Sequence, residues 1–82
     1  METRVAVISI IVENAESVVR LNELLHEYGE YIIGRMGIPY RAKGINIISV
    51  AIDAPQDKIN SLTGIIGKLD GISAKAAYSK LN

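Results

Sequence analysis

The chain has 82 residues, too few for two separate hydrophobic cores, so we expect one domain over residues 1–82. Hydrophobic residues make up 49% and charged residues 22% of it, which excludes a disordered polar chain. Nine Lys and Arg balance nine Asp and Glu. The chain therefore lacks the positive charge with which a free-standing nucleic-acid-binding protein neutralises phosphates, and we expect no direct nucleic-acid partner.

Cysteine is absent and histidine occurs once, at position 26. These counts exclude disulfides, Cys nucleophiles, iron–sulfur ligation by Cys and any multi-histidine metal site within one chain. The most apolar stretch, residues 5–12, is less than half the roughly 20 residues needed to cross a membrane, and no signal-peptide pattern precedes it. We expect a cytoplasmic protein with no membrane partner, no metal and no cofactor.

The first half of the chain predicts a strand, a helix and a strand. Residues 5–12 are apolar and β-branched on both alternating faces, which favours an interior strand covered on two sides. Asn14 is a candidate N-cap, and from position 18 apolar residues recur at helical spacing up to Gly29, a candidate left-handed C-cap. Residues 31–38 predict a second strand, which Pro39 is expected to end by withholding a hydrogen-bond donor.

The second half repeats this order. Residues 39–44 predict a hairpin loop and residues 45–52 a second interior strand. Pro55 suits the first turn of a helix, whose apolar stripe runs to residue 69 with Gly71 as the stop. Gly64 and Gly67 indicate either close backbone packing or a weakly held helix, because each costs about 1 kcal/mol relative to Ala. Residues 72–79 predict a final short strand.

Residues of the first half correspond to residues of the second half forty positions later. Ser9 corresponds to Ser49, and Arg35 corresponds to Lys75. A βαβ unit that occurs twice gives the ferredoxin-like βαββαβ plan of an α+β protein. Right-handed crossovers place both helices on one face of a four-stranded antiparallel sheet, with the strands over 5–12 and 45–52 at its centre.

Neither face of the two central strands is polar, although only one face would be covered by helices. Leaving about five aliphatic side chains in water forgoes roughly 1.5–3 kcal/mol apiece, against a total stability of about 5–15 kcal/mol. We expect a partner surface, most simply a second copy packed sheet to sheet or edge to edge in a homodimer or a dimer of dimers. The alternative is that the hairpin loop or the C-terminal residues fold under the sheet.

Four residues are candidates for a ligand-binding site. Arg35, Tyr40 and Arg41 flank the predicted hairpin together with Lys43, and such a cluster suits a small anionic ligand, with Arg for the anion and Tyr for stacking or a hydroxyl contact. An ordinary solvated loop is the alternative. His26 lies on the flank of the first helix and is a candidate polar interface contact, or else a partly exposed helix histidine.

Catalytic patterns are missing from the sequence. A Gly-rich phosphate loop would stand between the third strand and the second helix, where residues 53–56 read Asp-Ala-Pro-Gln. No nucleophile-elbow motif occurs, and His26 is the only histidine that could act as a general base. We expect neither a nucleotide site nor an enzyme.

Three runs of the sequence resemble a known family. Residues 22–26, residues 35–41 (Arg-Met-Gly-Ile-Pro-Tyr-Arg) and residues 62–67, followed by Gly71, Ile72 and Lys75, look like the small bacterial iron-only hydrogenase system regulators. The likeness spans nearly the whole chain, and the 35–41 run is not a generic strand pattern. That family is similar in fold to the C-terminal regulatory domain of nickel-responsive repressors, which is ferredoxin-like, ACT-like and tetrameric. The resemblance implies a ligand-sensing or assembly module.

The sequence departs from the nickel repressors at two points. His26 matches the position of their helix ligand, but Gly37, Pro39 and Ile45 stand in the region of their other metal ligands, so no nickel site of that kind is expected. We also expect no DNA-binding segment of the repressor kind before the first strand. The resemblance therefore implies a non-enzymatic regulatory or small-ligand-binding protein of the hydrogenase system that lacks its own DNA-binding segment. The alternative is a structural assembly partner that docks on a hydrogenase or its maturation proteins.

Overall fold

The structure is a computed structural model that describes residues 2–81, so positions 1 and 82 of the expected domain lie outside the described residues. Its strands and helices follow the order β1 (Arg4–Val12), α1 (Val18–Glu27), β2 (Ile32–Tyr40), β3 (Ile45–Ala54), α2 (Gln56–Gly67) and β4 (Ile72–Tyr78). Short 3₁₀ turns occupy Ala15–Ser17, Gly29–Tyr31 and Arg41–Lys43. The βαββαβ order is confirmed.

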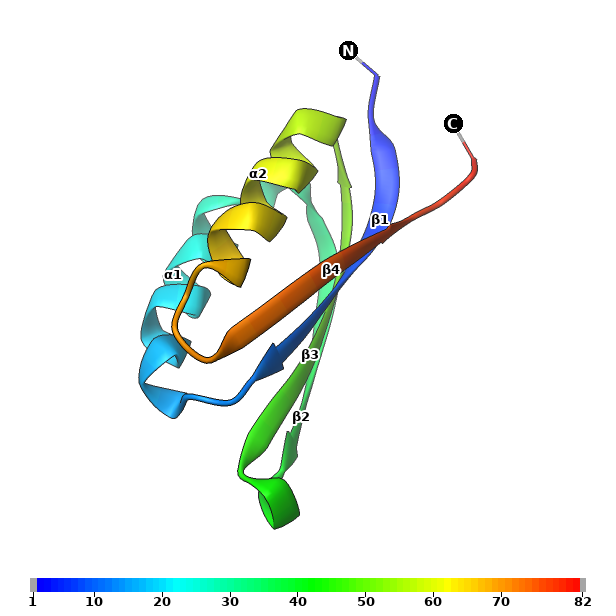
Figure 1. Ribbon diagram of the computed structural model, residues 1–82. Coiled ribbons are helices and arrows are strands. Elements are labelled where there is room, and N and C mark those ends of the chain that lie inside the picture. Colours follow the sequence, from blue (N-terminus) through cyan, green and yellow to red (C-terminus); the bar gives the residue numbers. More distant parts are fainter. Residues whose placement is uncertain (1, 82) are drawn as a thin grey trace.

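The four strands form one antiparallel sheet in the order β2-β3-β1-β4, with both helices against the same face (Figure 1). The central position of β1 and β3 is the one that right-handed crossovers require. This is a ferredoxin-like sandwich, and its strand order is compatible with an ACT-like domain. None of the helices among residues 2–81 is long and apolar enough to span a membrane.

The hydrophobic core lies between the sheet and the two helices. Alternate residues of β1 and β3 face the helices, and both helices turn one apolar stripe toward the sheet. No polar or charged side chain among the described residues is buried. The largest fully buried side chains are Ile8, Ile10, Val12, Leu21, Leu24, Val50, Ile52, Ile59, Leu62 and Ile66. Removing each of these side chains from water stabilises the fold by about 1.5–3 kcal/mol.

The other side of the sheet carries no helix. This open face consists of the odd-numbered residues of β1, β3 and β4 and the even-numbered residues of β2 from Gly34 onward. Its apolar side chains remain exposed to solvent, including 39% of Val7 and 42% of Ile11. The expected apolar character of both faces of the central strands is therefore confirmed, and neither the hairpin turn nor the C-terminal residues up to Leu81 bury this face.

The first helix begins and ends differently from the prediction. Asn14 does cap, because its side chain accepts a hydrogen bond from the backbone N–H of Glu16 at 3.0 Å, but the turn that it caps is 3₁₀ and α1 begins only at Val18. The prediction of Gly29 as a left-handed C-cap is wrong. Positive φ among the described residues occurs only at Gly44 and Gly71, and Gly29 begins a 3₁₀ turn instead.

Gly71 joins the loop after α2 to the loop after β1. It has φ +70°, and a Cβ built on it would lie 2.5 Å from the Cβ of Asn14. The backbone N–H of Glu13 donates to its carbonyl oxygen at 2.6 Å, and the hydroxyl of Ser17 donates to the carbonyl of Asp70 at 2.6 Å. Glycine is required here because a side chain would both strain the backbone and push the two loops apart.

Two further expectations about Pro and Gly are decided by the structure. Strand β2 runs through Pro39 to Tyr40, so the prediction that Pro39 ends the strand is wrong; β2 is an edge strand, where a missing N–H is tolerated. Pro55 lies at the N-cap, immediately before α2. Within α2, no atom lies within 4 Å of a Cβ built on Gly64 or Gly67, which excludes close backbone packing as their reason.

A β-bulge in β2 interrupts the forty-residue correspondence between the two halves of the chain. Ile32 pairs with Ile52 as Ile72 pairs with Val12, but the register of β2 shifts between Ile32 and Gly34. The predicted match of Arg35 with Lys75 is therefore wrong, because Met36 pairs with Ser49 where Lys75 pairs with Ser9. The extra residue turns the side chain of Arg35 toward the helix side of the sheet, as bulges do by reversing the alternation.

Candidate functional site

A groove runs between the C-terminal half of α1 and the first part of β2. It encloses about 360 Å³ and is lined by Asn22, Leu25, His26, Gly29, Ile32 and Arg35. Leu25 is buried and forms the apolar floor, whereas Arg35 and His26 are exposed at the rim. The groove thus combines an apolar base with polar side chains from two elements, as small-molecule sites commonly do.

The polar side chains are positioned by the helix repeat and by the bulge. Asn22 and His26 are four residues apart, so both lie on one face of α1, one turn from each other. Arg35 comes from β2 and donates through Nη2 to the Oδ1 atom of Asn22 at 3.1 Å. Without the bulge, the alternation of the strand would point Arg35 at the open face instead. The bulge therefore assembles this cluster.

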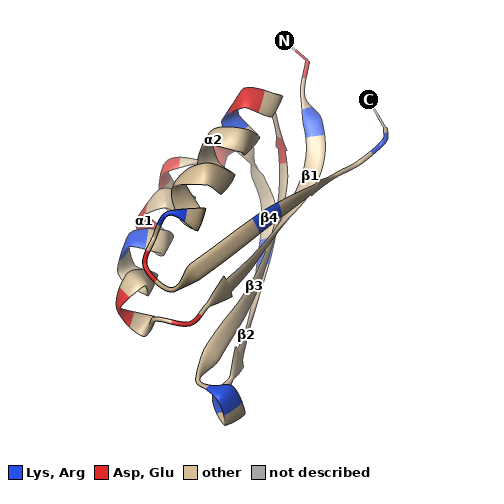
Figure 2. Ribbon diagram, viewed as in Figure 1, with Lys and Arg blue, Asp and Glu red and all other residues tan. Residues whose placement is uncertain are grey.

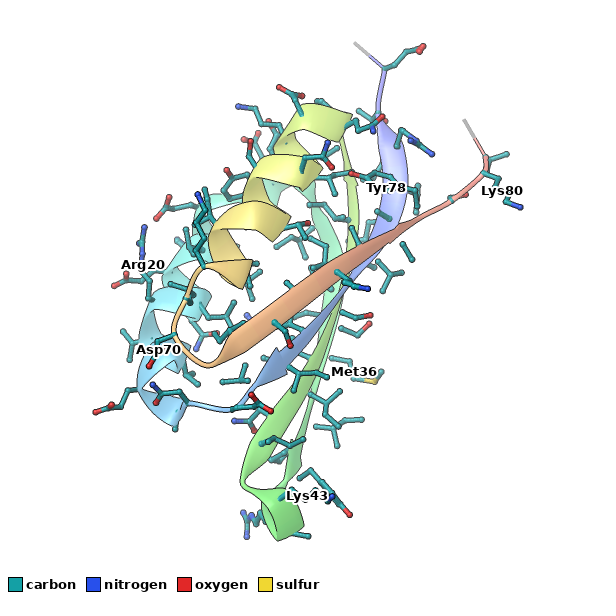
Figure 3. All side chains as sticks on the ribbon, in the orientation of Figure 1. Arg20, Met36, Lys43, Asp70, Tyr78 and Lys80 are labelled. Atoms are coloured by element: carbon teal, nitrogen blue, oxygen red, sulfur yellow. The ribbon has the colours of Figure 1, made fainter. Side chains whose placement is uncertain are left out.

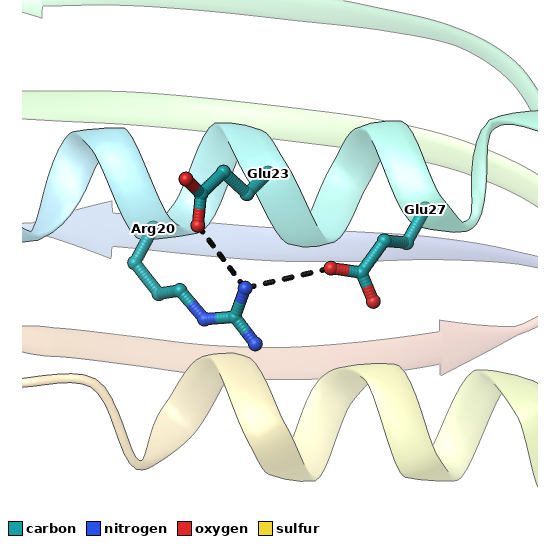
Figure 4. Close-up of polar contacts among 3 residues, drawn as sticks. All are labelled: Arg20, Glu23 and Glu27. Atoms are coloured by element: carbon teal, nitrogen blue, oxygen red, sulfur yellow. Dashed lines mark hydrogen bonds and ion pairs between the residues drawn. The ribbon is translucent and has the colours of Figure 1, made fainter.

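The charge of the groove is set by Arg35. No Asp or Glu lines it, and within residues 2–81 both ion pairs belong to Arg20, whose Nη1 atom lies 3.1 Å from Glu23 and 3.4 Å from Glu27 (Figure 4). Those two carboxylates of α1 already have a cationic partner. A guanidinium presents five N–H donors in a planar fork that matches carboxylate and phosphate. The chemistry that this arrangement favours is non-covalent binding of a small anion.

The other two predicted site residues lie elsewhere. Tyr40 is five residues beyond Arg35 along β2, about 16 Å at the rise of an extended strand, and its side chain belongs to the open face opposite Ile45. Arg41 and Lys43 lie in the turn at the hairpin tip, which projects away from the helices (Figure 2). The structure thus brings His26 and Arg35 together and separates both from Tyr40 and Arg41.

Sequence reasoning missed a second cationic cluster at the opposite end of the sheet. The guanidinium of Arg4 lies 4.5 Å from the ring centroid of Tyr78, and it donates to Gln56 Oε1 at 3.2 Å and to the carbonyl of Ser79 at 3.1 Å. A hollow of about 430 Å³ beside it is larger than the groove. Because this guanidinium already holds the end of β4 against β1, we interpret the cluster as structural. No local pattern in the sequence connects Arg4 with Tyr78.

Metal coordination has no set of donors in the described part of the chain. Among residues 2–81, no group of three or more His, Cys, Asp or Glu side chains is placed to share an ion. His26 has Asn22 and Arg35 as its polar neighbours in the groove, and a guanidinium repels a cation. The groove therefore suits anions rather than metals.

The sheet order, the single helix layer and the groove define a small ferredoxin-like α+β protein. A family model described as "TM1266-like: Iron-only hydrogenase system regulator, putative" matches residues 4–76, so the chain belongs to the TM1266-like family. This confirms the resemblance seen in the sequence.

Solved structures agree with this membership. The uncharacterized protein TM1266 from Thermotoga maritima is 31% identical, with a TM-score of 0.92, and the match covers 96% of this chain and 100% of that one. A formyltetrahydrofolate deformylase from Pseudomonas putida KT2440 shares the fold alone: it is 14% identical with a TM-score of 0.64 over 89% of this chain and 28% of its own. No curated protein matches the chain.

Proposed function

We propose that this protein is a non-enzymatic regulator in an iron-only hydrogenase system and that it responds to a small anionic ligand bound in the groove between α1 and β2. The family description supports the regulatory role and the system. The observation that carries the ligand is Arg35, which the bulge turns into a groove whose lining contains no carboxylate. Asn22 orients the guanidinium, and His26 supplies a further polar contact one helical turn away.

The lining of the groove supports binding rather than catalysis. Covalent catalysis needs a nucleophile within hydrogen-bond reach of a base. The groove contains one imidazole, that of His26, and no Ser, Thr, Cys, Lys or carboxylate that could act with it. A bound anion would replace Asn22 as the partner of the Arg35 guanidinium and would contact it through two hydrogen bonds. Binding of the anion in the groove would therefore change the contacts made by the end of α1.

Calorimetric titration with inorganic phosphate, citrate and L-glutamate tests the ligand part of this proposal. We expect one of these probes to bind and Arg35→Gln to weaken it at least tenfold, which corresponds to about 1.4 kcal/mol. Arg41→Gln is the matched control, since it removes the same charge at the hairpin tip and should leave the affinity unchanged. No heat from any of the three probes, or equal losses in the two variants, would overturn the groove as the site.

A second candidate function follows from the hairpin tip. Arg41 and Lys43 are exposed at the end of the β2-β3 hairpin, and neither forms an ion pair within the described part of the chain (Figure 2). A projecting basic tip fits an acidic surface on another protein, for which electrostatic complementarity sets specificity and association rate. In this role the protein would be an assembly partner that docks on a hydrogenase or on its maturation proteins.

The two functions separate experimentally because their residues lie apart. Purified hydrogenase and maturation proteins should be retained by the immobilised wild-type chain in the docking role, and the double variant Arg41→Glu with Lys43→Glu should release them. Arg35→Gln should leave that retention intact. A ligand sensor shows the opposite pattern, with anion binding lost in Arg35→Gln and preserved in the hairpin variant.

A further inference from the structure

The open face of the sheet is apolar and nearly uncharged, and no other segment of residues 2–81 covers it. Exposed fractions reach 61% for Met36, 52% for Ile38 and 47% for Tyr40, all on β2, and Met36 projects from the side of the sheet opposite the helices (Figure 3). Only Lys75 and Asp53 are charged among the residues that form this face. Depletion of charge with exposed aromatic, Met and aliphatic side chains is typical of the core of a protein interface.

The size of the open face matches an interface between proteins. Four strands about 4.8 Å apart, each about seven residues long at 3.3 Å per residue, give a flat patch of about 440 Å². Projecting side chains enlarge the accessible area of that patch, which brings it toward the roughly 800 Å² per partner that stable complexes bury. The open face therefore approaches in size the surface that each partner of a stable dimer buries.

The two halves of the open face differ in shape. The row of residues across its middle is Met36, Ser49, Ser9 and Lys75, from β2 to β4. The β2 half carries the large projecting side chains. The β4 half carries Ser73 and Ala77 and a hollow of about 230 Å³ bounded by Ser9, Ile11, Ser73, Ala74 and Lys75. A second hollow of about 280 Å³ lies on the β2 half, so both halves carry a depression, whereas the large projecting side chains of this face are concentrated on β2.

We propose that a second copy of the chain packs on the open face, sheet against sheet, about a two-fold axis parallel to the strands and above the Ser9–Ser49 pair. A rotation about this axis reverses the order of the strands across the sheet, so β2 of each copy lies over β4 of the other. Met36 of each copy then enters the hollow beside Lys75 of the other. Aligned sheets packed about 10 Å apart at about 30° give this geometry. This proposal goes beyond the proposed function and does not depend on it.

The alternative two-fold axis, across the strands, gives poorer packing. It would lay β2 antiparallel over β2 and β4 over β4, so that Met36 would meet Met36, Lys75 would meet the like charge of Lys75, and the small residues of β4 would face one another across a gap. Protein interiors and interfaces pack densely and leave few voids, so large side chains over the hollow of the β4 half are favoured. The asymmetry of the face therefore selects the first axis.

Sedimentation equilibrium at micromolar concentration tests the dimer. The wild type should sediment at twice its chain mass of 8.9 kDa. Ile38→Lys should weaken the dimer at least about 100-fold, because it buries an unpaired charge at the interface. Val19→Lys is the matched control: Val19 is 69% exposed on α1, and its variant should remain dimeric. A monomeric wild type, or equal mass for the wild type and a folded Ile38→Lys, would overturn the proposal.

Cross-linking tests the orientation without a destabilising charge. The chain contains no cysteine, so introduced thiols are unique. A short bifunctional maleimide should join Met36→Cys to Lys75→Cys when the two variants are mixed and should join neither variant to itself. Efficient self-linking of Met36→Cys would show β2 over β2 and overturn the proposed axis. A dimer that forms no cross-link, either in the mixture of the two variants or in either variant alone, would overturn sheet-to-sheet packing.

Discussion

The two faces of the central sheet are built from nearly the same residues but differ in what covers them. Ile10 is fully buried against the helices, whereas its neighbour Ile11 is 42% exposed on the open face. The same contrast separates Val50 from Ile47 on β3. The comparison teaches that an apolar residue in this sheet contributes to the stability of the monomer only where α1 and α2 cover it. On the open face, the same side chain is available for association.

The largest expected effect comes from truncating the two neighbouring isoleucines. Ile10→Ala should lower the free energy of unfolding by about 3–4 kcal/mol, because it leaves a cavity in a fully buried site. Ile11→Ala should lower it by about 1 kcal/mol or less. Urea unfolding in the monomeric Ile38→Lys background measures both without a contribution from association. Similar losses at the two positions would contradict the difference between the faces.

The next effect concerns the loops that fix the helix layer to the sheet. Gly71→Ala should lower the free energy of unfolding by about 2–3 kcal/mol, because it strains a positive φ and displaces Asn14. Gly44→Ala is the matched control at the hairpin tip, where φ is +65° but no atom lies within 4 Å of the new Cβ. Its loss should be about 1 kcal/mol. Thermal unfolding checks the order, and equal losses at the two positions would show that the loop contact is unimportant.

A smaller effect of opposite sign is expected on the outer surface of the helix layer. Gly64 is an exposed interior residue of α2, and a Cβ there would meet no atom within 4 Å. Gly64→Ala should therefore raise the free energy of unfolding by about 0.5–1 kcal/mol through helix propensity alone. Gly29→Ala, outside the helices, is the control and should gain less. Denaturant midpoints with unchanged slopes measure both, and a loss at Gly64 would reveal a contact on this surface.

The smallest effect belongs to the ion pairs of α1. Arg20 contacts Glu23 and Glu27 with about half of its side chain exposed, so solvent screens both interactions. Arg20→Gln should lower the free energy of unfolding by about 0.5 kcal/mol or less. Unfolding at low and high salt checks this, since the difference between wild type and variant should shrink as salt rises. A loss as large as that of Gly71→Ala would show that the surface of the helix layer governs stability.

Most of the fold was predictable because its signals are local. The continuous apolar runs of β1 and β3, the helical stripes of α1 and α2 and the N-cap at Asn14 depend only on neighbouring residues. Pro39 and Gly29 were misread because the outcome there depends on context: an edge strand tolerates a proline, and a 3₁₀ turn ended α1 before Gly29 could act as a cap.

The candidate site was predictable only in part. His26 and Arg35 were identified as chemistry-bearing residues, but the sequence grouped Arg35 with Tyr40 and Arg41 because they are close along the chain. The bulge after Ile32 reverses the side on which Arg35 lies and carries it to Asn22 on α1. A single extra residue in an edge strand leaves no clear pattern in one sequence, so this rearrangement needed the structure.

The sequence by itself determined the order of the elements, the apolar stripes of the helices and the apolar character of both sheet faces, since each follows from short-range periodicity and composition. The tertiary structure alone decided which face the helices cover, which side of β2 carries Arg35 and how large and small residues are distributed over the open face. These depend on strand register and layer packing between residues far apart in the chain. Local propensity contains no information about such pairings until the chain has folded.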